Sequence, residues 1–164
     1  MNALAEEMLR SALVIAAANL VFAVALGLAD RFGSHDRGVD SVTLLDALVI
    51  GCAQAFALIP GASRAGVTMT AGLVLGLSRR AAARFSFLMA VPVITLAGGL
   101  KGYEAFTDRV VVDSSALAVG VVFSAACALG CIHAFMELVE RVGMLPFVIY
   151  RLLLGVALLA FFVV

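Results

Sequence analysis

The chain has 164 residues, of which 64% are hydrophobic and 13% are charged. A soluble domain is normally about 45–50% apolar and 25% charged, so this composition excludes a soluble domain and indicates a helical membrane protein. The formal net charge is zero, which gives no reason to expect a nucleic-acid partner. We therefore predict a single all-α integral membrane domain over residues 1–164.

Four transmembrane helices are predicted from the longest apolar segments, because one span needs about 20 apolar residues. The first covers residues 11–29, and the others cover residues 81–99, 114–136 and 144–164. Most arginines lie in the loops on one side of this arrangement. The positive-inside rule makes that side cytoplasmic, so both termini are predicted to lie outside.

Between the first two spans lies an apolar stretch over residues 44–77, which is interrupted once, at residues 60–64. It is too long for one span of about 20 residues and too short for two spans with a turn. Proline disfavours helix in the residue before it, and glycine permits a sharp turn, so two short helices are predicted to meet at residues 60–64. Irregular backbone at membrane depth is tolerated only beside protein or a water-filled cavity. We therefore predict a re-entrant hairpin whose turn lies in a polar site.

Arg64 lies inside this apolar stretch, where an ionised side chain without a partner is costly. No carboxylate lies between Asp46 and Glu104, so an external anion is the economical partner. Free amides at a helix N-terminus bind anions, and a guanidinium can bind two phosphate oxygens at once. Ser63, Arg64 and Thr68 are therefore predicted to be the catalytic residues of a phosphate or phosphoester site.

Four further residues are predicted to bind substrate: Gln54 on the first arm, Gly61 and Ala62 in the turn, and Arg151 in the last span. Structural roles remain open as alternatives. Ser63 could simply cap the second helix, and Thr68 could bond back to a carbonyl. Gln54 could bridge two helices, and Arg151 could extend its charged end to the membrane surface.

Small residues elsewhere are predicted to serve packing. Gly72 and Gly76, spaced as GxxxG, are predicted helix-packing positions. Cys52, Cys127 and Cys131 lie in apolar segments and are predicted to be small buried residues. No metal site is assigned to any residue of the chain.

Two stretches of the sequence resemble a known family. The stretch QAFALIPGASRAGVTMTAGLVLGLSRRAAARFSFLMAVPVI resembles the second signature region of the undecaprenyl-diphosphatase family, the bacitracin-resistance membrane phosphatases, whose motif is P-G-x-S-R-S-x-x-T. The matching positions are Pro60, Gly61, Ser63, Arg64 and Thr68, and Ala65 stands where serine is usual. The ending PFVIYRLLLG resembles the last helix of that family.

The resemblance implies a fold of two inverted repeats, each with a re-entrant helix pair and three spans. This chain would supply the second repeat, and its first span would match the last helix of the first repeat. It is therefore expected to form half of an inverted-repeat fold. The family's first-repeat motifs, E-x-x-x-E and P-V-S-S-x-G-H, do not occur in the chain.

The implied activity is hydrolysis of undecaprenyl diphosphate to undecaprenyl phosphate and phosphate, which recycles the lipid carrier of peptidoglycan synthesis. The implied location is the bacterial plasma (inner) membrane, with several spans. The family also implies a divalent cation, Mg²⁺ or Ca²⁺, whose natural ligands belong to the first repeat and are not present in this chain. The expected partners are the polyprenyl diphosphate lipid and either a second copy or a second chain carrying the missing repeat.

Two alternative hypotheses for the function of the chain remain open. The chain could be a non-catalytic protein that binds or translocates a lipid phosphate, because transporters also hold anions at broken helices. It could also be a gene remnant without activity. The first alternative predicts binding of a diphosphate lipid without hydrolysis, even with metal supplied.

Overall fold

A computed structural model of the chain describes residues 12–107 and 114–163. Within these ranges the chain forms helices joined by turns and loops, and the described part contains no β-strand. The protein is thus all-α, as its sequence predicts. Ser11 and Val164, the first and last residues of the predicted spans, lie outside the described residues.

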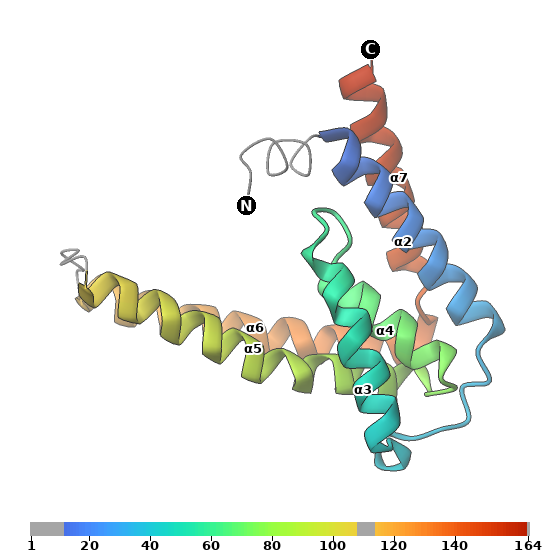
Figure 1. The fold of residues 1–164 in the computed structure, drawn as a ribbon, viewed down its shortest axis with the longest axis horizontal. Coiled ribbons are helices and arrows are strands. Elements are labelled where there is room, and N and C mark those ends of the chain that lie inside the picture. The colour runs from blue at the N-terminus through green and yellow to red at the C-terminus, as the bar shows by residue number, and fades with distance from the viewer. Residues whose placement is uncertain (1–11, 108–113, 164) are drawn as a thin grey trace.

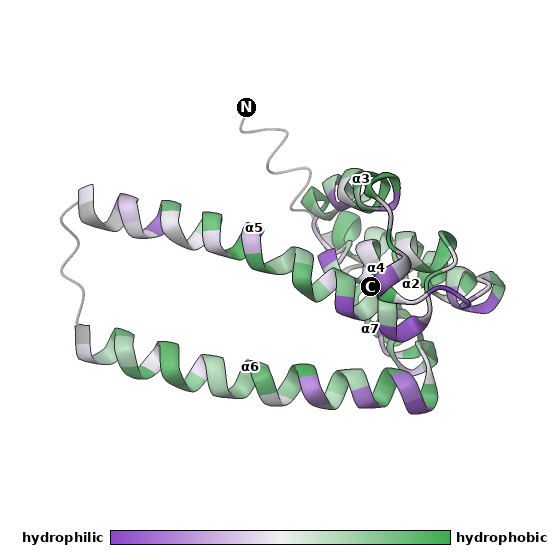
Figure 2. Ribbon diagram, turned by 90° about the horizontal axis from the view of Figure 1, so that it is seen from below, coloured by the Kyte–Doolittle hydropathy of each residue, from purple (hydrophilic) through white to green (hydrophobic). Residues whose placement is uncertain are grey.

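The helices form two groups that diverge from one junction (Figure 1). One group is the pair α2 (Ala12–Phe32) and α7 (Leu145–Val163), which pack along each other. The other is the pair α5 (Arg79–Thr107) and α6 (Ser114–Val142), which run side by side away from the junction (Figures 1 and 2). The junction itself contains the shorter helices α3 (Leu44–Ala53) and α4 (Arg64–Val74).

Three of the described helices are long and apolar enough to cross a membrane: Leu13–Phe32, Arg79–Glu104 and Ser115–Val142. The apolar helices Leu44–Leu58 and Leu145–Phe161 are shorter. The last helix, predicted as a fourth span, is therefore shorter in its described part than the other three. Hydrophobic residues cover most of α5 and α6 (Figure 2). Together with the composition, these helices make the chain a multi-pass membrane protein.

Helices α5 and α6 extend beyond the predicted spans into segments that were predicted to be loops. Ion pairs within each helix stabilise these polar extensions. In α5, Lys101 Nζ pairs with Glu104 Oε2 at 2.6 Å. In α6, Arg141 Nη2 pairs with Glu137 Oε1 at 2.6 Å. Opposite charges three or four residues apart stabilise a helix, so these polar segments stay helical instead of forming loops.

The predicted hairpin consists of α3, a short 3₁₀ helix (Gln54–Leu58), a turn, and α4. Thr43 begins α3 with a capping box, in which Thr43 Oγ1 accepts from the Asp46 amide and Asp46 Oδ2 accepts from the Thr43 amide. Before α3 the chain forms a loop with one 3₁₀ turn at Val39–Ser41. A capping box satisfies two amides that the helix itself leaves free, which explains why α3 begins at Leu44.

The two glycines of the GxxxG pattern have different roles. A Cβ on Gly72 would lie 3.1 Å from the Ala82 Cβ, so Gly72 packs against α5 as predicted. Gly76 lies beyond the end of α4 at φ +85°, where its amide bonds to Leu73 O and the Leu77 amide bonds to Gly72 O, both at 3.0 Å. This pattern ends a helix and favours glycine, so the prediction that Gly76 packs helices was wrong.

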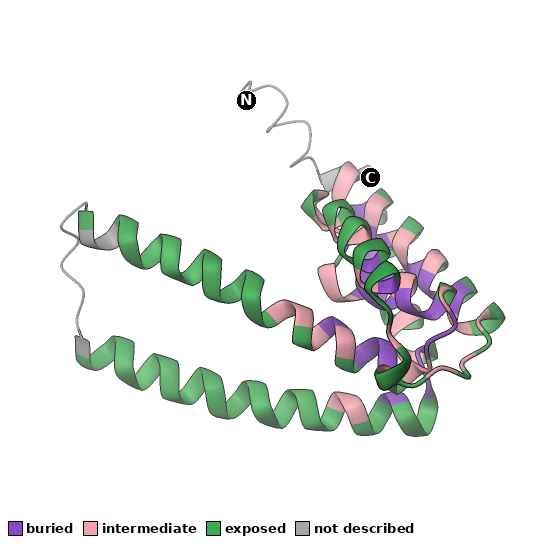
Figure 3. Cartoon of the chain, turned by 60° about the horizontal axis from the view of Figure 1, so that its bottom comes forward, coloured by how far each residue is buried: buried purple, intermediate pink, exposed green. Residues whose placement is uncertain are grey.

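The buried core lies where the two helix groups meet the hairpin (Figure 3). Its largest fully buried side chains include Ile50, Leu73, Leu77, Val139 and Met144. The outer part of α5 and nearly all of α6 are exposed (Figure 3).

The three cysteines are also exposed, although the sequence predicted them to be buried. They occupy apolar surface, not the core. The reason is that apolar composition in a membrane protein marks lipid-facing surface as well as interior.

Candidate functional site

The turn of the hairpin lies directly against α2. Gly61 has a φ of +92°, a conformation that side chains with a Cβ rarely adopt. A Cβ at this position would also collide with the backbone oxygen of Ile15 in α2. Both the turn and the close approach therefore require glycine at position 61.

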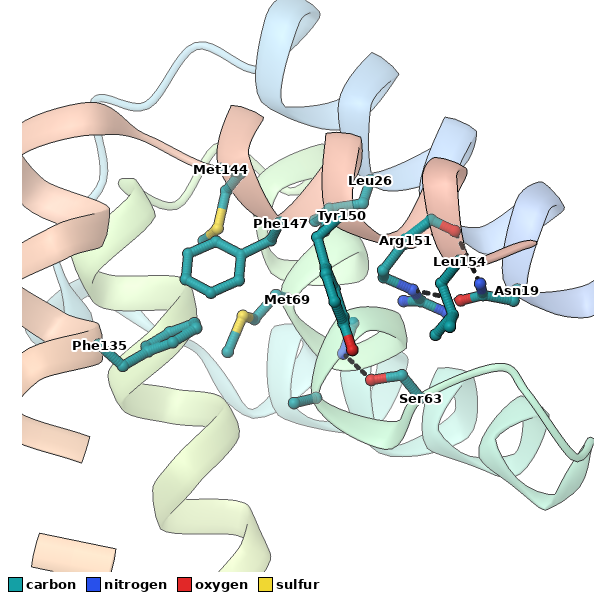
Figure 4. Close-up of a pocket in the computed structure, with 12 residues that line it drawn as sticks. Asn19, Leu26, Ser63, Met69, Phe135, Met144, Phe147, Tyr150, Arg151 and Leu154 are labelled. Atoms are coloured by element: carbon teal, nitrogen blue, oxygen red, sulfur yellow. Dashed lines mark hydrogen bonds between the residues drawn. The ribbon is translucent and has the colours of Figure 1, made fainter. Parts of the chain in front are cut away.

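Helix α7, which packs along α2, also holds this turn, through Arg151. The Nη2 atom of Arg151 donates to the carbonyl oxygens of Gly61 and Ala62, each at 3.0 Å. Its Nε atom donates to Asn19 Oδ1 of α2 at 2.8 Å, and Asn19 Nδ2 donates to Arg151 O at 2.8 Å (Figure 4). Arg151 is only 9% exposed, so these bonds form inside the protein.

One nitrogen of Arg151, Nη1, is buried and has no hydrogen-bond partner among the residues that the structure describes. It lies over Gly66 so closely that a Cβ there would collide with it, and Ser63 Oγ is 3.5 Å from the same Cβ position. The first turn of α4 therefore has an unused cationic donor next to the Ser63 hydroxyl.

Ser63 caps α4 in a strained conformation. Its Oγ accepts from the Gly66 amide at 3.4 Å, which is the capping role considered from the sequence. Its φ is +60° with a ψ of 108°, which is unfavourable for a residue other than glycine. Such strain costs about 1–3 kcal/mol and is concentrated at functional sites. Because the residue is also exposed, its hydroxyl is available to a ligand.

These groups form the polar end of a cavity of about 310 Å³ (Figure 4). The polar side chains that line the cavity are those of Asn19, Ser63, Tyr150 and Arg151. Much of the remaining wall is apolar and comprises Leu26, Met69, Phe135, Met144, Phe147 and Leu154. The cavity therefore has one end suited to an anion and a wall suited to a hydrocarbon chain.

Arg64 joins the two arms of the hairpin and is not among the residues that line this cavity. Its Nε donates to Gln54 Oε1 at 3.2 Å, so Gln54 bridges the arms, as one of the sequence alternatives has it. The Nη2 atom of Arg64 is buried, and no residue in the described part of the chain forms a hydrogen bond with it. Among the described residues, no carboxylate forms an ion pair with Arg64. A second guanidinium therefore has unused donor capacity next to Ser63 in the sequence.

Thr68 is turned away from the cavity. Its hydroxyl is within bonding distance of the carbonyl oxygens of Arg64, at 3.0 Å, and Ala65, at 3.2 Å. It also lies 2.6 Å from Ser86 Oγ of α5, and Thr68 is only 2% exposed. Ser63, Arg64 and Thr68 therefore all lie at the start of α4, but of the three only Ser63 lines the cavity. Thr68 would reach a ligand only by giving up these bonds.

The described residues do not offer a centre for a divalent cation. They contain no group of three or more His, Cys, Asp or Glu side chains placed to hold a metal ion. The cavity lining contributed by residues 12–107 and 114–163 includes no carboxylate. Since Mg²⁺ and Ca²⁺ prefer oxygen ligands with carboxylates among them, the donor set found here does not fit either ion.

Sequence reasoning did not identify Asn19 or Ser86. Each is a polar residue whose immediate neighbours in the sequence are apolar, and such residues in membrane helices usually have a partner inside the protein. That signal could have selected them as buried. It could not have identified Arg151 and Thr68 as their partners.

The chain is similar to proteins of known family. The family model described as bacitracin resistance protein BacA matches residues 1–157. An undecaprenyl-diphosphatase 2 from Stutzerimonas stutzeri is 56% identical over 160 residues, which cover 96% of this chain and 59% of the relative. An undecaprenyl-diphosphatase from Nitrosococcus oceani is 52% identical over 157 residues, with the same shares of 96% and 59%. The chain thus spans about 59% of the length of these curated relatives.

Proposed function

Because the chain belongs to the bacitracin resistance protein BacA family, we propose that it binds the diphosphate of a polyprenyl lipid and takes part in its hydrolysis. The relatives are named undecaprenyl-diphosphatase, so the proposed substrate is undecaprenyl diphosphate and the products are undecaprenyl phosphate and phosphate. The observation that carries the proposal is the cavity, in which the free Arg151 Nη1 and Ser63 share one end with an apolar wall beyond them.

The diphosphate is proposed to bind at the start of α4. Free amides at a helix N-terminus carry partial positive charge, and Arg151 Nη1 adds a full cation to that position. The Ser63 hydroxyl is exposed and lies beside it. Gly61 and Ala62 contribute through their carbonyls, which hold Arg151 in place, so their proposed part in binding is indirect.

The lipid tail is proposed to follow the apolar wall. Met69 and Met144 contribute flexible side chains, and Phe135 and Phe147 contribute aromatic rings, whose centroids lie 4.6 Å apart. Methionine side chains adapt to irregular apolar ligands, and aromatic rings offer large contact area. This combination suits an unsaturated hydrocarbon chain better than a soluble phosphate ester.

Arg64 is proposed to stabilise charge during phosphoryl transfer. Attack at phosphorus spreads negative charge over the equatorial oxygens, and a preorganised guanidinium stabilises that charge. The Gln54 side chain orients Arg64 through Nε, which leaves the buried Nη2 for an oxygen. Thr68 is proposed to support this arrangement by fixing the first turn of α4 against Ser86.

The described residues that line the cavity include no carboxylate and no histidine, the side chains that most often accept a proton from water. We propose that the carboxylates come from the family's E-x-x-x-E motif, carried either by a separate polypeptide or by sequence upstream of this chain. The divalent cation implied by the resemblance, Mg²⁺ or Ca²⁺, would find its ligands in that segment as well. A homodimer would add a second pair of arginines but no such motif.

Phosphate release from undecaprenyl diphosphate tests this function. The purified chain is assayed in detergent with Mg²⁺ or Ca²⁺, alone and mixed with a separately produced segment that carries the E-x-x-x-E motif. We expect release from the mixture and its loss in Arg64→Ala. Release that is undiminished in Arg64→Ala would contradict the role of Arg64.

A second function, binding or translocation of a lipid phosphate without hydrolysis, is favoured by one observation. One end of the cavity offers hydrogen-bond donors from Arg151 and Ser63, whereas its described lining includes no carboxylate. This alternative predicts that the lipid diphosphate binds but that the mixture with the second segment releases no phosphate.

A further inference from the structure

We infer that Asn19 is a positioning residue of this site, which orients Arg151 and through Arg151 fixes the turn at Gly61 and Ala62. The positioning itself rests on the geometry alone. Its effect on lipid binding rests on the proposed function.

The first support is the reciprocal contact between α2 and α7. Asn19 accepts from Arg151 Nε and donates to Arg151 O, both at 2.8 Å. A carboxamide accepts through its oxygen and donates through its nitrogen at the same time, whereas an ionised carboxylate only accepts. Asn19 is 6% exposed, so water does not compete effectively for these bonds.

The second support is the planarity of the guanidinium. Asn19 holds the Nε edge, and the two turn carbonyls hold Nη2. Because the group is rigid and planar, fixing two of its nitrogens also fixes the direction of the third, which is the free Nη1. Without Asn19, Arg151 could rotate about its side-chain bonds and withdraw Nη1 from its place over Gly66.

The third support is that the helices approach closely at this point. A Cβ on Gly155 of α7 would lie 2.6 Å from Leu20 Cδ2 and 3.3 Å from Asn19 Nδ2. The absence of a side chain at Gly155 lets α2 come near enough for Asn19 to reach the Arg151 backbone. The contact thus depends on the packing of α2 against α7. Through Arg151, this packing also determines the position of the turn.

A simpler reading is that Asn19 only joins α2 to α7, as polar residues often do between membrane helices. That reading predicts lower stability in Asn19→Ala with an unchanged turn. It also predicts that the effects of changing Asn19 and Arg151 on the turn are unrelated. A positioning role predicts that they depend on each other.

Hydrogen exchange of the amides of residues 59–67 separates the two readings. The 164-residue chain is compared in detergent with Asn19→Ala, Arg151→Met and the double variant, and Val24→Ala on the exposed face of α2 is the control. We expect exchange in the turn to be about tenfold faster in either single variant, as for the loss of hydrogen bonds to a charged group. The double variant should be no faster than Arg151→Met, because residues in one network are not additive. Unchanged exchange in Asn19→Ala, or additive effects in the double variant, would overturn the inference.

Affinity for farnesyl diphosphate, a short polyprenyl diphosphate, gives the functional readout on the same variants. We expect binding about tenfold weaker in Asn19→Ala and partial recovery in Asn19→Asp, which still accepts from Arg151 Nε. Wild-type affinity in Asn19→Ala, despite faster exchange, would reduce Asn19 to a packing residue and overturn its role in the site. If no variant, including the wild type, binds the probe while exchange changes as expected, the proposed function fails and the positioning role stands.

Discussion

Arg37 and Asp46 form an ion pair at the base of the hairpin, with Arg37 Nη2 2.6 Å from Asp46 Oδ2. Arg37 also donates to Leu75 O at 3.0 Å, and its backbone bonds to Gly76 and Ser78. One loop residue therefore holds the start of α3, the end of α4 and the approach to α5 together. Arg37 therefore fixes the two ends of the hairpin to each other, at the end opposite to its turn.

Replacement of Arg37 should loosen this base. Arg37→Ala removes the bonds to Asp46 and Leu75 and leaves the Asp46 carboxylate, which is 8% exposed, without its cation. We expect a lower unfolding temperature in detergent. Arg141→Ala is the control, because its pair with Glu137 is exposed and such pairs contribute little. Equal unfolding temperatures for the two variants would show that the base of the hairpin does not depend on Arg37.

The same pair predicts a pH dependence. The bonds from Arg37, followed by those from Thr43, hold the pKa of Asp46 well below its usual range. A carboxyl whose pKa is lowered by folding stabilises the protein above its unfolded value of about 3.9, and this contribution is lost as the pH falls further. Asp46→Asn should therefore flatten the loss of thermal stability below about pH 4. A wild-type slope in Asp46→Asn would contradict this assignment.

Ser63 offers a test of backbone strain. Ser63→Ala loses the cap and keeps the φ of +60°, whereas Ser63→Gly loses the hydroxyl but relieves the strain. We expect Ser63→Gly to be more stable than Ser63→Ala by about 1 kcal/mol. Both should bind a polyprenyl diphosphate more weakly than the wild type, because both lack the hydroxyl. Chemical denaturation measures the free energy of unfolding of both variants. A higher value for Ser63→Ala than for Ser63→Gly would show that residue 63 is not strained.

Gly66 tests the position of Arg151. An alanine in a helix is normally more stable than glycine by about 1 kcal/mol, but a methyl at Gly66 collides with Arg151 Nη1. We expect Gly66→Ala to destabilise the wild type and to stabilise Arg151→Met, in which the nitrogen is gone. Gly51→Ala is the matched control, because a Cβ at Gly51 meets nothing within 4 Å. A stabilising Gly66→Ala in the wild type would show that Nη1 does not lie over this position.

Variants of Thr68 and Ser86 show whether Thr68 contacts the substrate directly or only supports α4. Thr68→Val keeps the shape of the side chain and leaves the Ser86 hydroxyl without its partner, at a cost of about 1–3 kcal/mol. The double variant Thr68→Val with Ser86→Ala should regain much of that stability. If Thr68 only supports α4, lipid binding is regained as well. Binding that stays lost in the stable double variant would favour direct contact between Thr68 and the ligand.

Much of this site could be predicted from local sequence. Pro60 and Gly61 mark the turn, and Ser63 is a standard cap, because each acts on its own backbone. The charge of Arg64 in an apolar stretch predicts a functional role for the same local reason, and this role stays a prediction. These features do not depend on which helices pack together.

The remaining features depend on contacts that the sequence does not encode locally. Asn19 and Arg151 lie 132 positions apart, and their contact exists only because α2 packs on α7. Thr68 faces Ser86 and not the cavity because α5 packs behind α4. Periodicity shows that these residues sit in apolar helices, but not which helix lies opposite.

Equilibrium binding of undecaprenyl diphosphate tests the central claim, that the start of α4 holds the diphosphate of a polyprenyl lipid. Undecaprenol, which has the same tail and no phosphate, is the matched ligand, and Arg64→Ala and Arg151→Met are compared with the wild type in detergent. We predict that the wild type prefers the diphosphate by at least about tenfold, and that each arginine variant loses most of this preference. Equal affinity of the wild type for both lipids, or an unchanged preference in both variants, would contradict the claim.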